Sequence, residues 1–209
     1  MRSLSVERFL QMPLMQDTNK LAAMKVLGLL IRHTYRSDQI LCSVLICRMV
    51  QLTVTDGISD ESAISIAGFG VHCIMVAAIN TIQIMDEEVH RYAKVSQALA
   101  DRFGSNHRSF ARVLLSVAIV KMFFEPFQAL PDLLDRAFEV GMSSGNIEDA
   151  FGARQIKTII SPLTGAKLGP RAEEARDFRA LLNEYGHATL ISMSIPFQAI
   201  LNLIGGDVD

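Results

Sequence analysis

The apolar residues of this chain recur mainly at every third or fourth position, which is the period of an amphipathic α-helix. Three of the apolar runs stop at a glycine, and each stop is followed by a polar residue and a new apolar run. The glycines are Gly57, Gly104 and Gly145, and the polar residues are Ser59, Asn106 and Asn146. A glycine after a helix can take the left-handed conformation that ends it, and a Ser or Asn side chain can cap the next helix. The pattern therefore predicts helix ends and starts at these positions.

The spacing of the three glycines predicts how the helices are grouped. Their positions differ by 47 and 41 residues, which leaves room for one pair of helices in each interval. Such spacing is typical of stacked helical hairpins that bury their apolar faces against their neighbours. Because no segment has a confident strand pattern, we predict an all-α fold of antiparallel helical hairpins, stacked as a tetratricopeptide-like superhelical array.

The organisation along the chain follows from the same signals. We expect an N-terminal lead-in over residues 1–17, helical hairpins over 18–160, a loop over 161–170, a terminal helix pair over 171–205 and a polar tail over 206–209. The loop prediction depends on the turn formers in SPLTGAKLGP, since Gly and Pro disfavour helix interiors.

Individual residues suggest further helix boundaries. We expect the first helix over 18–35, with Ser37 as the N-cap of the second. A helix over 106–125 should end before Pro126 and be buried on several sides, because residues 113–124 are almost wholly apolar. Pro131 suits the first turn of the next helix, where a missing N–H has little cost.

Composition and charge exclude several classes of protein. The 209 residues are 50% hydrophobic and carry a net charge of −2, without a Lys/Arg cluster, which argues against disorder and against nucleic-acid binding. The cysteines Cys42, Cys47 and Cys73 lie in apolar helical runs and predict buried free thiols in a reducing compartment. Glu7 and Arg8 interrupt the stretch where a secretion signal would be apolar. We therefore expect a cytoplasmic location.

Two segments are long enough to span a membrane. Residues 62–85 and 188–206 contain no charged side chain. However, both hold several polar residues, and Pro196 lies in the middle of the second. Neither segment is flanked by a basic cluster that would set its orientation. These features favour helices buried inside a repeat stack over membrane spans.

The order of four segments resembles a known family. They are RMVQLTVTDGISDESAISIAGFG (Arg48 to Gly70), VHRYAKVSQALADRFG (Val89 to Gly104), GNIEDAFGA (Gly145 to Ala153) and QAILNLIGG (Gln198 to Gly206). From about Leu41 to Gly205 the chain resembles the tetratricopeptide-like helical region of very large signalling proteins. In these, a protein-kinase-like domain and a P-loop ATPase module precede the helices, and GAF, PAS and histidine-kinase domains often follow. The resemblance implies a regulatory spacer, or a fragment of a longer protein.

The catalytic chemistry of that family does not extend to this segment. There is no phosphate-binding G-x-x-x-x-G-K-[ST] loop, because TGAKLG (Thr164 to Gly169) lacks the spacing and the preceding strand. There is also no protein-kinase signature set. We therefore predict that the segment is not an enzyme.

Two groups of residues offer candidate chemistry, and both favour a structural interpretation. Two E-x-x-H pairs, Glu87 with His90 and Glu184 with His187, match part of a di-iron ligand set, but no central carboxylates complete it. His72 and Cys73 are adjacent in an apolar helix, so they point about 100° apart and form no common site. We predict no catalytic, cofactor-binding or metal-binding residues.

The function that the sequence favours is therefore recognition. We expect a helical scaffold that contacts a protein partner, or adjacent ATPase, kinase and sensory domains of the same polypeptide. Three alternatives stay open. They are a metal-binding bundle, a polytopic helical membrane protein, and a small-molecule sensor with a pocket near His72 and the phenylalanines of the helix predicted at 106–125.

Overall fold

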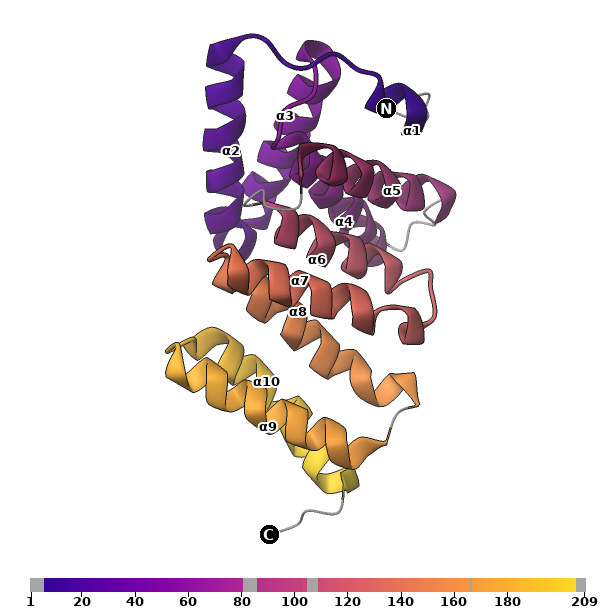
Figure 1. Cartoon of the computed structure of the whole chain (residues 1–209), viewed down its shortest axis with the longest axis vertical. Helices are drawn as coiled ribbons and strands as arrows, with labels where there is room; N and C mark the ends of the chain where they lie inside the picture. Colours follow the sequence, from indigo (N-terminus) through magenta and orange to yellow (C-terminus); the bar gives the residue numbers. More distant parts are fainter. Residues whose placement is uncertain (1–5, 81–85, 105–108, 166, 206–209) are drawn as a thin grey trace. The chain divides into compact units, whose positions relative to one another are not determined.

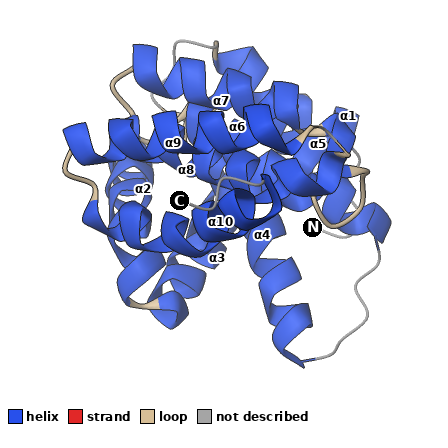
Figure 2. Cartoon of the chain, turned by 90° about the horizontal axis from the view of Figure 1, so that it is seen from below, coloured by secondary structure: helices blue, strands red, loops and turns tan. Residues whose placement is uncertain are grey.

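The fold is all-α, as the sequence predicted. We analysed a computed structural model that describes residues 6–80, 86–104, 109–165 and 167–205, and this part of the chain contains no β-strand (Figure 2). The chain forms two compact units, residues 1–124 and residues 125–209.

The first unit contains six helices among its described residues, and Figure 1 labels them along the chain. They are α1 (Val6–Leu10), α2 (Thr18–Ser37), α3 (Gln39–Asp56), α4 (Ser62–Asn80), α5 (Asp86–Phe103) and α6 (Phe110–Lys121). Helices α2 and α3 pack as one pair and α4 and α5 as another, while α6 packs on both α4 and α5. Helix α4 also contacts α3, so it is the centre of this unit.

The second unit contains two helical pairs. Helix α7 (Pro131–Ser143) packs on α8 (Ile147–Ile160), and α9 (Leu168–Glu184) packs on α10 (Ala188–Gly205). The short 3-10 helices η1 (Phe127–Ala129) and η2 (Ser161–Thr164) precede α7 and α9. Pro131 begins α7, as predicted.

The three glycine stops are confirmed by their backbone angles. Gly57, Gly104 and Gly145 have φ angles of 104°, 96° and 73°, a region that residues with a side chain rarely adopt. At Gly57 a Cβ atom would also lie 2.6 Å from the carbonyl oxygen of Pro13. This close approach belongs to the isolated β-bridge between Leu14 and Ile58, which ties the N-terminal segment to the α3–α4 turn.

The capping residues differ from the prediction in two places. Ser37 is the last residue of α2, and Asp38 caps α3 instead, because its carboxylate accepts a hydrogen bond from the N–H of Leu41. Asn146 does occupy the N-cap position of α8, but its side chain donates to Asp149 and makes no capping bond. Asn106 lies outside the described residues, and Ser59 lies three residues before the start of α4.

Two other helix boundaries differ from the prediction. The helix predicted over 106–125 is α6, which ends at Lys121 because the chain tightens to i→i+3 hydrogen bonds before Pro126. Residues 161–170, expected to be a loop, include η2 and the start of α9 at Leu168. Pro170 fits there because the first N–H groups of a helix have no partner within it.

Helix α6 is buried on several sides, as its apolar composition predicted. Its buried residues are Phe110, Ala111, Val113, Leu114, Val117, Ala118 and Val120. Gly70 of α4 lies against Tyr92 and Val120, where a Cβ atom would be 3.4 Å from each side chain. The small residue therefore allows α5 and α6 to approach α4 closely.

Among the described residues, one helix is long and apolar enough to cross a membrane by length and composition, and it is α3. One third of it (33%) is buried inside the protein. The two segments that the sequence singled out overlap α4 and α10 instead, and residues 81–85 and 206 lie outside the described part.

Candidate functional site

The side of α2 that faces solvent carries large apolar side chains. Met24, Gly28 and Ile31 lie on the buried side of the helix. Val26 and Leu29, on the other side, are 55% and 56% exposed, and Leu30 is exposed next to them. Helix α2 is therefore apolar on a face that no other element of the described chain covers.

Helix α3 repeats this arrangement in its first half. Its buried side includes Cys42, Ile46 and Met49. Ile40 is 81% exposed and Val44 is 59% exposed, and Leu41 is exposed between them. The second half of the exposed side is polar, with Arg48 hydrogen-bonded to Gln51.

The two exposed groups lie on one hairpin, because α2 and α3 are joined by a turn of a single residue at Asp38. Thr34 near the end of α2 hydrogen-bonds Cys42 near the start of α3, so residues four positions from each, Leu30 and Ile46, lie at about the same level. In this register Val44 is level with Arg32, so the exposed group of α3 lies nearer the turn than the exposed group of α2. We call the two groups together the α2–α3 surface, made of Val26, Leu29, Leu30, Ile40, Leu41 and Val44.

The charge of this hairpin is opposite to that of the whole chain. Residues 18–56 contain five basic and two acidic side chains, a formal charge of +3, whereas the whole chain has −2. Helix α2 itself carries Lys20, Lys25, Arg32 and Arg36 and no acidic residue. An apolar surface on a basic hairpin is suited to an apolar partner that carries acidic residues at its edge.

One ion pair holds the far end of the hairpin together. The ammonium group of Lys20 contacts the carboxylate of Asp56. Through this hydrogen bond the pKa of Lys20 is raised, and the pKa of Asp56 is lowered by the same contact. Lys20 therefore has a partner inside the unit, while Lys25 is exposed on the outer part of the helix.

Sequence reasoning missed this surface, although a signal was present. Ile40, Val44 and Cys47 recur at helical spacing, which predicts a buried apolar stripe, but all three face solvent. The prediction that the cysteines are buried is right for Cys42 and wrong for Cys47, while Cys73 is half-buried. The available signal was that α2 and α3 are apolar over more of their circumference than one covered side requires.

The structure gives His72 and Cys73 a structural role. Nδ1 of His72 in α4 lies 3.0 Å from Oγ of Ser43 in α3. Since that hydroxyl donates to the carbonyl oxygen of Gln39, it accepts the proton of Nδ1. Burial lowers the pKa of His72 and raises the pKa of Cys73 to about 11, so the thiol stays protonated and is a poor nucleophile.

The E-x-x-H pairs are separated into different packing environments. The ring of His90 lies 5.1 Å from the ring of Phe124, and the ring of His187 lies 5.9 Å from that of Phe151. Glu87 is exposed. Within the described residues, no group of three or more His, Cys, Asp or Glu side chains is placed to hold a metal ion.

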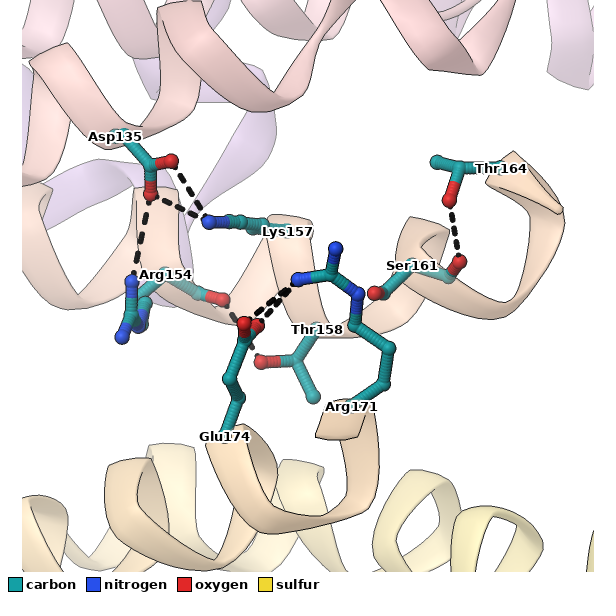
Figure 3. A network of polar contacts seen from close by, with 8 residues as sticks. All are labelled: Asp135, Arg154, Lys157, Thr158, Ser161, Thr164, Arg171 and Glu174. Carbon is teal, nitrogen blue, oxygen red and sulfur yellow. Dashed lines mark hydrogen bonds and ion pairs between the residues drawn. The ribbon is translucent and has the colours of Figure 1, made fainter. Parts of the chain in front are cut away.

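Polar side chains of the second unit form contacts both between helices and within them (Figure 3). Nζ of Lys157 in α8 lies 2.7 Å from both carboxylate oxygens of Asp135 in α7, and Nη1 of Arg154 lies 3.4 Å from one of them. On α9, Nη1 of Arg171 lies 2.7 and 2.8 Å from the two oxygens of Glu174. The contacts of Asp135 therefore join α7 to α8, whereas the Arg171–Glu174 pair lies within α9.

Comparison of the chain with protein-family models, with curated proteins and with solved structures finds no match.

Proposed function

We propose that this chain is a non-catalytic helical scaffold of the tetratricopeptide-like kind, which binds a protein partner through the α2–α3 surface. The observation that carries the proposal is the exposure of six large apolar side chains on two adjacent helices. Single exposed apolar residues are normal on protein surfaces, whereas a contiguous group is typical of interaction sites.

The partner that suits this surface is an amphipathic helix with acidic residues beside its apolar face. Two neighbouring helices present side chains in parallel rows, and a third helix can lay its own apolar stripe against both. The formal charge of +3 on residues 18–56 favours an acidic edge and faster encounter with such a partner.

The resemblance to large signalling proteins suggests where that helix comes from. We propose that the chain is a regulatory spacer in the cytoplasm, and that its partner is an adjacent ATPase, kinase or sensory module or a separate protein. An immunoblot of the native gene product, with an antibody raised to this segment, tests the first origin. A band several times larger than 23.1 kDa supports it, and a band at 23.1 kDa contradicts it.

The surface itself is tested by charge substitution. The double variant I40D/V44D places two carboxylates on the α2–α3 surface, and L163D changes a side chain of similar exposure in η2 (58%) as a control. Both variants should retain the wild-type free energy of unfolding within about 0.5 kcal/mol, since the altered side chains are exposed.

The two variants should differ in what co-purifies with them from the source cells. We expect proteins that are retained by wild type and by L163D but lost from I40D/V44D. If I40D/V44D retains the same proteins as L163D, the α2–α3 surface is not the binding site. Loss of binding to anionic lipid vesicles, with unchanged protein partners, would assign the surface to a membrane instead.

A further inference from the structure

The buried side chains of the second unit are aromatic and aliphatic at one end of its helices and small or polar farther along. At the end near the α9–α10 turn, a cluster of Phe151, Phe178, Leu182 and Leu190 fills the core. The rings of Phe151 and Phe178 are 5.9 Å apart at their centroids. Farther from this turn, the buried residues of α9 are Ala172 and Ala175, which form a cluster of their own.

Helical periodicity places polar side chains at the level of these alanines. Gln155 follows Phe151 by one turn in α8, and Ser194 and Gln198 follow Leu190 by one and two turns in α10. Ala175 lies one turn before Phe178 in α9, which runs back along α8 (Figure 1). We call this set the Gln155 layer, made of Gln155, Ala172, Ala175, Ser194 and Gln198, all of them buried.

The amide of Gln155 has unused hydrogen-bonding capacity. The side chain is 3% exposed, and neither its Nε2 nor its Oε1 has a hydrogen-bond partner in the described part of the chain. Ser194 is already satisfied, because its hydroxyl donates to the carbonyl oxygen of Ile191. A buried amide with an unpaired donor and an unpaired acceptor is unfavourable, and native proteins usually provide both with partners.

The layer lies where the two helical pairs of this unit meet. Helix α8 packs mainly on α7, and α9 packs mainly on α10, while α8 meets α9 and α10 over fewer residues. No member of the layer is charged. The charged residues nearby in sequence are engaged with one another, Asp135 with Lys157 and Arg171 with Glu174.

We propose that the Gln155 layer binds a small, uncharged, planar molecule that carries a hydrogen-bond donor beside an acceptor, such as a pyrimidine base or a carboxamide. The Nε2 group of Gln155 would donate to the carbonyl of the ligand, and its Oε1 atom would accept from the adjacent N–H. A charged ligand is disfavoured because burial of a charge without a partner is costly. Ala172, Ala175 and Ser194 contribute only small side chains to the layer.

The test uses uracil and nicotinamide as probes and toluene as an apolar ring without the amide. Melting temperature is measured for wild type, Q155M and Q128M, where Gln128 is an exposed glutamine of the same unit and serves as the matched control. We expect wild type and Q128M to melt a few degrees higher with at least one amide probe at about ten times its Kd. Q155M should show no such rise, and toluene should have no effect on any variant.

A second readout needs no variant to fold. In ¹⁵N NMR spectra of the wild-type protein, the side-chain amide signal of Gln155 should move on addition of the probe that raises the melting temperature. Three results would overturn the proposal. They are no response to either amide probe, an equal response of Q155M, and an equal response of wild type to toluene.

Discussion

The hairpins α2–α3 and α7–α8 are built from similar local signals but differ in the sides they expose. In α7–α8, Gly141 lets the helix backbones approach closely, and ion pairs from Asp135 to Lys157 and Arg154 join the two helices. Within the described residues, neither α7 nor α8 exposes a large apolar side chain. In α2–α3, seven such side chains are exposed, namely the six of the α2–α3 surface and Tyr35. The contrast shows that the apolar α2–α3 surface is a local property of one hairpin and is not imposed by the helical fold.

A first test of the comparison is the close helix contact in α7–α8. A Cβ atom on Gly141 would lie 2.7 Å from the Cβ of Ala150 and 3.0 Å from its backbone. We expect G141V to lower the free energy of unfolding by about 1–3 kcal/mol, because the helices must move apart. Urea unfolding monitored by circular dichroism measures this loss.

G169A provides the matched control for G141V. Gly169 lies in the first turn of α9, and a Cβ atom there would meet nothing within 4 Å. Alanine is the better helix former, so the free energy of unfolding should stay the same or rise by up to about 1 kcal/mol. If both variants lose the same stability, the close contact is not what holds α7 to α8.

Leucine truncations compare a covered helix face with an exposed one. Leu134 in α7 is 1% exposed, whereas Leu29 in α2 is 56% exposed. We expect L134A to lower the free energy of unfolding by about 2–5 kcal/mol through lost burial and a cavity. L29A should change it by less than about 0.5 kcal/mol. A loss above about 1.5 kcal/mol for L29A would mean that the α2–α3 surface belongs to the folded core.

The ion pairs of α7–α8 should contribute much less. The side chains of Asp135 and Lys157 are 38% and 13% exposed, so solvent screens part of their attraction. We expect D135N to lower the free energy of unfolding by about 0.2–1 kcal/mol, with a smaller loss at high salt. A loss that is independent of salt would argue that hydrogen-bond geometry, rather than charge, joins the helices.

The smallest expected effect concerns His72 of α4, which contacts Ser43 of α3. Burial lowers the pKa of His72 below its usual value of 6.5, so the unfolded chain binds a proton at this residue more readily than the folded chain. The free energy of unfolding should therefore decrease as the pH falls through 6.5 toward the lower folded pKa. H72N should show a weaker dependence on pH in this range. If the pH dependence of H72N equals that of wild type, groups other than His72 cause it.

Local signals predicted much of the fold. The positive φ angles of Gly57, Gly104 and Gly145 followed from glycine chemistry alone. The start of α7 at Pro131 and the burial of α6 also followed from sequence. Capping was less predictable, because Ser37 and Asp38 are both good cap residues and only the finished turn selects Asp38.

The candidate sites were not predictable for a physical reason. Hydrophobic periodicity shows that α2 and α3 are apolar, but not which of their apolar sides remains uncovered, since that depends on tertiary packing. Ile40 and Val44 therefore looked like core residues and are exposed. Gln155 lies within a helical run where a polar residue would ordinarily face solvent, yet it is buried. Its position became apparent only after the packing of α8 was known.

The most direct test of the central claim is photo-cross-linking in the source cells. The photoreactive residue p-benzoylphenylalanine replaces Val44 on the α2–α3 surface or, as the control, Leu163 in η2. We predict a discrete cross-link to another protein, or to another domain of a longer polypeptide, from position 44 and not from position 163. Equal labelling at the two positions, or cross-linking of position 44 only to a second copy of this chain or to lipid, would contradict the claim.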